Sequence, residues 1–192
     1  KSHKTPEIAR RQIAMGAVGI CCQKVSEAEC FVDAGVRDVL IANEVIGAQK
    51  VKRVAHLARR ARVAVCVDNP QGVAELSAAA DAAGVVIDVL VELDVGANRC
   101  GVAPGELAVQ LARAVKGAPY LRFAGLQAYH GAAQHVRSAH ERELAIEHAI
   151  GLTKMTRDSL ARFNIACETI TGAGTGSFLF EARSRVFNEL QP

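Results

Sequence analysis

The sequence predicts an α/β fold in which parallel strands alternate with helices, and it favours a closed (β/α) barrel over an open sheet. Apolar runs of strand length are separated by longer stretches in which apolar residues recur every three or four positions. The runs are continuous, as in Asp88-Val-Leu-Val-Glu-Leu-Asp94, which is typical of strands buried on both faces. No Gly-x-Gly-x-x-Gly motif follows the first strand, which argues against a dinucleotide-binding sheet.

The strands and helices can be assigned in chain order from these patterns. The apolar runs predict strands at Gly19–Gln23, Asp38–Asn43, Ala64–Asp68, Asp88–Asp94, Phe123–Tyr129 and Thr169–Gly172. The helical spacing predicts helices at Pro6–Met15, Ser26–Ala34, Ala48–Arg60, Gln71–Ala83, Glu106–Val115 and His140–Phe163. An earlier strand is expected to be cut off at Lys1, so the eight-unit barrel is incomplete in this chain.

Composition places the chain among ordinary single domains. Half of its 192 residues are hydrophobic and its net charge is +3. The basic cluster Arg59-Arg60-Ala61-Arg62 is interpreted as a solvated helix end, with a nucleic-acid patch as the alternative. No apolar stretch is long enough to span a membrane and no signal peptide is visible. Because the chain starts at Lys1 without methionine, we expect it to be a segment of a longer protein.

The cysteines point to a reducing compartment, and we expect a cytoplasmic protein. Six are present without a Cys-x-x-Cys pair, and three lie inside apolar runs, namely Cys21, Cys22 and Cys66. Neither a disulfide framework nor a zinc site made of these thiols is expected.

Polar residues follow nearly every predicted strand. They are Gln23, Asn43, Glu44, Asp68, Asn69, Asp94, Asn98, Arg99, Gln127, Tyr129, His130 and the loop Gly172–Ser177. In (β/α) barrels the chemistry takes place at these strand ends, in the strand-to-helix loops. A purely structural barrel has no need of such side chains, so an active or binding site is predicted there.

The loop Thr171-Gly-Ala-Gly-Thr-Gly-Ser177 is the clearest local motif. Its glycines allow backbone N–H groups to approach an oxyanion, and Thr175 and Ser177 can add hydroxyl donors, so a phosphate site is one hypothesis. The alternative is a tight turn that needs glycine for its positive φ angles. No Gly-Lys-Ser/Thr follows, so the loop is not a Walker motif.

Lys1-Ser2-His3-Lys4 places two lysines beside a histidine at the expected end of the truncated strand. A lysine amine near other cations can condense with an aldehyde, although a basic tetrapeptide at a chain end is more often simply solvated. Together with a phosphate site across the barrel mouth, such a lysine suggests a phosphorylated aldehyde cofactor, pyridoxal 5′-phosphate (PLP).

Arg99 and the pair Tyr129–His130 are further candidates. Arg99 can hold a cofactor oxyanion or a substrate carboxylate, or alternatively form a salt bridge with Asp94 or Glu92. Tyr129 and His130 can hydrogen-bond a ring or take part in acid–base chemistry. The remaining histidines are expected on the surface, and no His/Asp/Glu group has convincing metal-ligand spacing.

Taken together, the motifs resemble the D-threonine aldolase and D-serine dehydratase group of PLP enzymes, whose barrel is like that of alanine racemase. Five segments carry the resemblance in order: Lys1-Ser-His-Lys-Thr-Pro-Glu-Ile-Ala, Gly19-Ile-Cys-Cys-Gln-Lys-Val-Ser-Glu-Ala, Asp94-Val-Gly-Ala-Asn-Arg-Cys-Gly-Val, Gly125-Leu-Gln-Ala-Tyr-His-Gly and Thr169-Ile-Thr-Gly-Ala-Gly-Thr-Gly-Ser. The whole chain, residues 1–192, would then be the PLP-binding barrel domain, and within the group it is most similar to the aldolases.

The resemblance implies a role for each matching residue. Lys1 would carry PLP, with Lys4 as the less favoured candidate, and Arg99 would contact the O3′ side of the cofactor. Tyr129 would lie beside the ring. Gly174 and Thr175 would help to hold the phosphate, and Gln23 would be a pocket residue.

The resemblance also implies an activity and a missing part. The expected reaction is cleavage of D-threonine and other D-3-hydroxy amino acids to glycine and an aldehyde, in a protein that is usually a homodimer. A dehydratase acting on D-serine or D-threo-3-hydroxyaspartate, an alanine racemase and a non-catalytic PLP carrier are the alternatives. The family's C-terminal β domain, with its divalent-metal site for manganese or a similar ion, is expected beyond residue 192, so no metal ligand is assigned in this chain.

Overall fold

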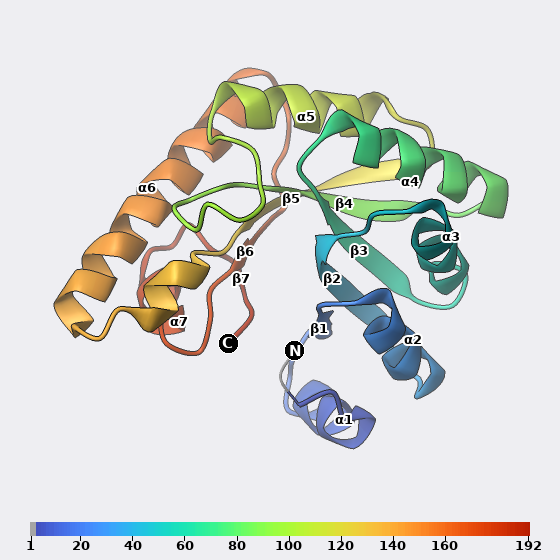
Figure 1. Cartoon of the computed structure of the whole chain (residues 1–192), viewed down its shortest axis with the longest axis horizontal. Helices are drawn as coiled ribbons and strands as arrows, with labels where there is room; N and C mark the ends of the chain where they lie inside the picture. The colour runs from blue at the N-terminus through green and yellow to red at the C-terminus, as the bar shows by residue number, and fades with distance from the viewer. Residues whose placement is uncertain (1–2) are drawn as a thin grey trace. The chain divides into compact units, whose positions relative to one another are not determined.

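The computed structural model describes residues 3–192, which alternate between strands and helices (Figure 1). The strands are β1 (Ile20–Cys22), β2 (Asp38–Glu44), β3 (Arg62–Val67), β4 (Ile87–Glu92), β5 (Leu121–Ala128), β6 (Thr169–Gly172) and β7 (Glu189–Leu190). The helices are α1 (Pro6–Ala14), α2 (Val25–Asp33), α3 (Ala48–Leu57), α4 (Pro70–Ala83), α5 (Glu106–Gly117), the 3-10 helix η1 (Gly131–His135), α6 (Ala139–Arg162) and α7 (Phe178–Arg183).

The strand order identifies the topology. In the sheet the strands follow chain order from β1 to β7, and the pairs β1/β2, β2/β3, β5/β6 and β6/β7 are parallel. Parallel strands in sequential order are the topology of a (β/α) barrel, whereas a doubly wound sheet reverses its order at a switch point. The predicted α/β fold is confirmed, and the described strands fall short of the eight that a complete barrel has.

All six predicted strands and all six predicted helices are present, with ends displaced by a few residues. Three short elements were not predicted, namely η1, α7 and β7. The helix α7 has six residues and β7 has two, which is too short for a hydrophobic period to be visible in the sequence.

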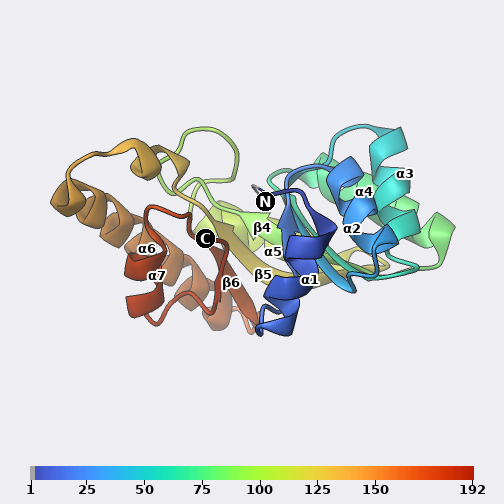
Figure 2. The ribbon, with the colours of Figure 1, turned by 90° about the horizontal axis from the view of Figure 1, so that it is seen from below.

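The chain forms two compact units, one made of the residues up to Val89 with Val115–Arg122, the other of Leu90–Ala114 with Phe123–Pro192. In the first unit, helices α3 and α4 lie side by side (Figures 1 and 2). Its core contains the nearly inaccessible side chains of Val39, Ile41, Val51, Val54, Val63, Leu76 and Ile87. These residues come from β2, β3 and β4 and from the two helices, so burial of apolar surface between the strands and the helices stabilises this unit.

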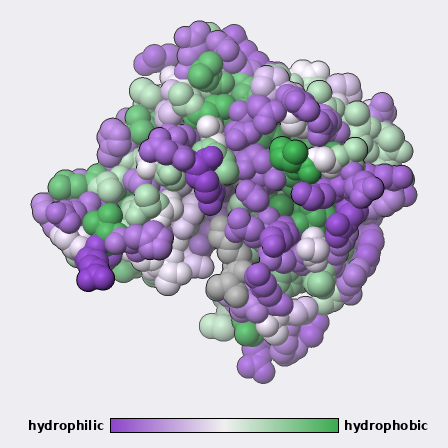
Figure 3. Space-filling model, in the orientation of Figure 1, coloured by the Kyte–Doolittle hydropathy of each residue, from purple (hydrophilic) through white to green (hydrophobic). Residues whose placement is uncertain are grey.

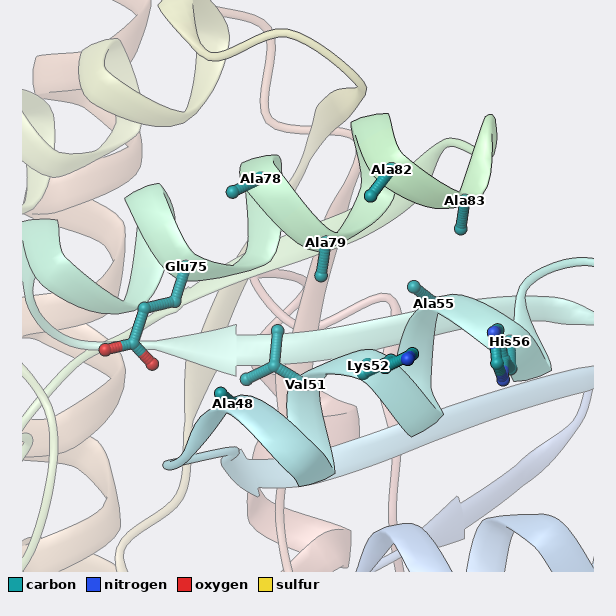
Figure 4. Close-up of a pocket in the computed structure, with 10 residues that line it drawn as sticks. All are labelled: Ala48, Val51, Lys52, Ala55, His56, Glu75, Ala78, Ala79, Ala82 and Ala83. Atoms are coloured by element: carbon teal, nitrogen blue, oxygen red, sulfur yellow. The ribbon is translucent and has the colours of Figure 1, made fainter.

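A groove of about 450 Å³ runs between α3 and α4 in the first unit (Figure 4). Its lining includes six alanines, Ala48, Ala55, Ala78, Ala79, Ala82 and Ala83. Small side chains leave space between two packed helices, and no predicted site residue within the described part of the chain lines this groove.

Ion pairs at the amino ends of the strands connect neighbouring elements of the first unit. The carboxylate of Asp88 is 3 % exposed and accepts hydrogen bonds from Arg62 Nε at 2.8 Å and from Arg122 Nε and Nη2 at 2.6 Å each. Arg62 also donates to Asp38 at 3.0 Å. The predicted helix end at Arg59–Arg62 is therefore wrong in part, because α3 ends at Leu57 and Arg62 begins β3.

The second unit contains β5 from Phe123 onward, β6 and β7, with α6 and α7 side by side (Figure 2). Leu93, Leu126, Ile146 and Leu160 are buried in its core. Two glycines allow β5 and β6 to approach closely, since a Cβ atom on Gly125 would lie 1.8 Å from the Thr169 carbonyl oxygen and one on Gly172 would lie 2.3 Å from that of Ala128.

The surface carries most of the charged side chains, and hydrophilic residues occupy much of the face in Figure 3. All six cysteines lie among the described residues and none of them forms a disulfide; Cys22 and Cys66 are buried and Cys21 is half-buried. Among the helices of residues 3–192, none combines the length and the apolar character needed to cross a membrane.

The Asp88 cluster leads to a prediction about stability. Asp88→Asn is expected to lower the free energy of unfolding by about 2 kcal/mol, since it weakens charge-assisted hydrogen bonds to two arginines at a buried position. Asp38→Asn is the matched control, because its side chain is 35 % exposed and its ion pair is worth at most about 1 kcal/mol. Urea unfolding of both variants measures the difference, and equal effects would contradict the assignment.

Candidate functional site

The carboxyl ends of β4, β5 and β6 meet in the second unit. Leu93 N–H donates to the Gln127 carbonyl oxygen at 2.8 Å, and Ala128 pairs with Gly172 in the register of β5 and β6. The three loops that leave these strands therefore start side by side. They contain Arg99, the Tyr129–His130 pair and the glycine-rich loop 172–177.

The loop after β4 folds back on itself and presents Arg99. Asp94 Oδ1 accepts hydrogen bonds from the N–H groups of Gly96 and Asn98, each at 3.0 Å, and Val102 N–H donates to the Glu92 carbonyl oxygen at 2.9 Å. At Gly101 φ is +102° and an added Cβ would lie 2.5 Å from Asp94 N, so this return requires glycine.

Arg99 contacts both an acid and an aromatic ring. Its Nη2 lies 3.3 Å from Oε1 of the buried Glu92, and its Cζ lies 5.9 Å from the centroid of the Tyr129 ring. Burial acts to lower the pKa of Arg99, but its interactions with Cys100 and Glu92 outweigh burial and raise it. The predicted salt bridge is therefore made with Glu92, and the guanidinium stays a cation beside Tyr129.

His130 packs against the loop after β4. A Cβ on Gly96 would lie 2.9 Å from His130 Nε2, so the ring sits directly over this glycine. Its Nδ1 is buried and has no hydrogen-bond partner among residues 3–192. Burial lowers the pKa of His130, while the carboxylate of Asp94 opposes the shift, so the ring is neutral near pH 7 and can accept a proton. The other histidines that we placed on the surface, His56, His135, His140 and His148, are exposed.

The glycine-rich loop uses its glycines for space. Gly172, Gly174 and Gly176 do not have positive φ, and the residue with positive φ in this loop is Ala173, at +70°. A Cβ on Gly174 would instead lie 2.8 Å from Gln134 Oε1, and one on Gly176 would lie 3.0 Å from the same oxygen. The interpretation of these glycines as a turn that needs positive φ is therefore wrong.

Gln134, which our sequence analysis missed, holds this loop. Its Oε1 accepts a hydrogen bond from Gly176 N–H at 2.8 Å, and its Nε2 donates to Ser177 Oγ at 2.8 Å. Gln134 belongs to η1, which directly follows Tyr129 and His130. No motif surrounds it, so only the three-dimensional arrangement reveals its role.

Ser177 faces inward. Its hydroxyl donates to Glu181 Oε1 at 2.9 Å, and its Oγ accepts from Gly174 N–H at 3.3 Å. Glu181 is 3 % exposed, and burial raises the pKa of its carboxyl while hydrogen bonds from its own backbone and from Ser177 oppose the shift. The Ser177 hydroxyl is therefore directed toward Glu181, and its role as a donor to an anion stays a prediction.

The remaining predicted site residues are placed as follows. Gly174 is buried and Thr175 is exposed, both in the loop after β6. Gln23 lines a cavity of about 390 Å³ at the carboxyl ends of β1 and β2 in the first unit, together with Asn43 and Glu44. Lys1 lies outside the described residues.

The second unit thus combines a permanent cation, an aromatic ring, a neutral imidazole and a loop whose glycines leave room for close backbone contacts. A cation beside an aromatic face suits a planar anionic ring, and backbone N–H groups in a tight loop suit a phosphate. The chemistry of these groups therefore fits a planar cofactor that carries a phosphate.

Comparison with known proteins identifies the family. Residues 1–192 match the alanine racemase N-terminal domain. The chain is 51 % identical over 191 residues to a D-threonine aldolase of an Arthrobacter species and 46 % identical over 193 residues to a 3-hydroxy-D-aspartate aldolase of Paracoccus denitrificans. Both alignments cover the whole chain and 50 % of the relative.

A solved structure agrees. The crystal structure of D-threonine aldolase from Filomicrobium marinum superposes with a TM-score of 0.98 at 56 % identity, over 100 % of this chain and 52 % of that one. The chain thus spans about half the length of the relatives it matches. On the match over its full length, the chain belongs to the alanine racemase N-terminal domain family.

Proposed function

We propose that the protein is a PLP-dependent lyase that cleaves D-threonine and other D-3-hydroxy amino acids to glycine and an aldehyde. The observation that carries this proposal is the 51 % identity over the whole chain to a protein named D-threonine aldolase. A second relative is named for the aldol cleavage of 3-hydroxy-D-aspartate, which supports the same reaction on a different β-substituent.

Four of the proposed roles belong to residues of the second unit. Arg99 would contact the phenolic oxygen of the cofactor, Tyr129 would lie beside its ring, and Gly174 with Thr175 would hold its phosphate. Lys1 attaches the cofactor covalently. The role of Gln23, in the first unit, as a pocket residue is proposed from the resemblance alone. The bound cofactor supplies an electron sink for the carbanion left when the Cα–Cβ bond breaks.

The described residues fit such a cofactor. The glycine-rich loop is packed so tightly that a Cβ on Gly172 or Gly174 would overlap its neighbours, and Thr175 and Gly176 are the exposed residues that a phosphate could contact. Arg99 remains a cation through its contacts with Cys100 and Glu92, so it can face an oxyanion. The neutral His130 can hold or accept a proton at the same strand ends.

We propose that the metal site of the enzyme lies in a domain outside this chain. We propose a C-terminal β domain that would hold a divalent metal, manganese or a similar ion, as the Lewis acid for the β-hydroxyl of the substrate. The family's usual homodimer and a location in the cytoplasm are part of the same proposal.

The attachment of the cofactor is tested at the lysines. Lys1→Ala in the full-length protein is expected to abolish both the visible absorbance of bound PLP and the release of aldehyde, because no amine remains to condense with the cofactor. Lys4→Ala is the matched control, since Lys4 Nζ pairs with Glu27 Oε1 at 3.0 Å and has a structural partner. A Lys1→Ala protein that stays yellow and active would overturn the assignment.

Removal of the metal distinguishes the role of the proposed metal site from that of the cofactor site. Treatment of the full-length protein with a chelator is expected to reduce aldehyde release at least about tenfold while the PLP absorbance persists, because the proposed metal ligands lie outside this chain. Re-addition of Mn²⁺ should restore the rate. Formation of a keto acid and ammonia instead of glycine and aldehyde would identify a dehydratase and refute the aldolase proposal.

A further inference from the structure

We propose that Glu181, Ser177 and Gln134 form a directional hydrogen-bond chain that positions the glycine-rich loop 172–177 for the cofactor phosphate. In this proposal Gln134 is the positioning residue that contacts the loop backbone, and Glu181 sets the direction of the chain. The inference rests on the proposed function, since it assumes that the loop binds the phosphate of PLP.

The direction of the hydrogen-bond chain follows from the number of hydrogens that Ser177 and Gln134 can donate. Ser177 has a single hydroxyl hydrogen, and its shortest acceptor is Glu181 Oε1 at 2.9 Å, compared with 3.5 Å for the Gly174 carbonyl oxygen. Ser177 Oγ is then left to accept, which it does from Gln134 Nε2 at 2.8 Å. The amide of Gln134 must therefore turn its nitrogen toward Ser177 and its oxygen toward Gly176 N–H.

The geometry of Gln134 limits where the loop can lie. Its Oε1 is 2.8 Å from the position that a Cβ of Gly174 would occupy, and it accepts the N–H of Gly176. One amide oxygen thus touches the loop at two glycines, so that residue 175 between them is held as well. Since Gln134 follows Tyr129 and His130 in η1, the same side chain links the proposed ring side of the site to its phosphate side.

Stability alone does not account for Glu181. The residue is 3 % exposed, and among the described residues its Oε2 has no hydrogen-bond partner. A buried carboxyl with an unsatisfied oxygen costs free energy, so its presence calls for an explanation. An acceptor at this position is useful because it directs the hydroxyl of Ser177 away from Gln134.

A comparison of PLP with pyridoxal isolates the phosphate contribution. Both bind through the aldehyde, but pyridoxal lacks the phosphate, so the ratio of their dissociation constants reports on the loop. In the full-length apoprotein, Gln134→Met is expected to reduce the preference for PLP over pyridoxal about tenfold. That equals the loss of about 1.4 kcal/mol, the size of one or two hydrogen bonds. Gln110→Met is the matched control, because Gln110 is exposed on α5 and contacts Glu106.

Two variants of Glu181 test the direction of the chain. Glu181→Gln retains an acceptor for the Ser177 hydroxyl and should keep the preference for PLP within about twofold of the wild type. Glu181→Met removes the acceptor and should reduce the preference about as much as Gln134→Met does. A merely structural role would not produce this rescue by the amide.

The outcomes distinguish the two proposals. If the wild type binds pyridoxal as tightly as PLP, the loop holds no phosphate and the proposed roles of Gly174 and Thr175 fail. If the wild type prefers PLP and Gln134→Met keeps the same preference, the positioning role is wrong while the proposed function stands. A variant that weakens PLP and pyridoxal equally also contradicts the inference, because the loss is then general. Thermal unfolding of each variant, and of Ser177→Ala as a further single variant in the hydrogen-bond chain, shows which proteins are folded.

Discussion

The close approach of β5 and β6 is the constraint on which the candidate site depends. Gly125 and Gly172 permit it, since a Cβ at either position would overlap a carbonyl oxygen of the neighbouring strand. Their parallel register pairs Ala128 with Gly172 and so brings the loop that starts at Tyr129 beside the glycine-rich loop. Without this approach, Gln134 would not reach the loop that it holds.

Stability and the candidate chemistry are located at opposite ends of the strands. At the amino ends, Asp88 is buried between Arg62 and Arg122, and all three residues belong to strands of the first unit. At the carboxyl ends, Arg99 and His130 lie in loops, where polar groups face ligands in barrel proteins. The loop after β4 is ordered by Asp94, whose carboxylate accepts hydrogen bonds from two backbone N–H groups of the loop. Arg99 therefore follows a turn of defined geometry.

The sequence predicts those parts of the fold that depend on local patterns. Continuous apolar runs predicted every strand except β7. The polar residues that follow these runs in the sequence included Arg99, Tyr129 and the loop after β6. Contacts distant in sequence left no such pattern, and Gln134 meets Ser177 across 43 positions. The glycines of the loop after β6 illustrate the same limitation. Their number in the sequence indicated an unusual backbone, but only the packing shows that Gln134 occupies the space where a Cβ would lie.

The short length of α7 explains why the loop geometry matters so much. With six residues, α7 offers a small macrodipole, so a phosphate in front of it would gain little from the helix itself. Binding must then depend on individual N–H groups, whose directions are set by the loop backbone. Gly176 N–H is already used by Gln134, and Ser177 is turned toward Glu181. Gly174 N–H donates to Ser177 Oγ, so the backbone is fixed on both sides of the exposed Thr175. Our proposal that Gly174 and Thr175 hold the phosphate therefore depends most on Thr175.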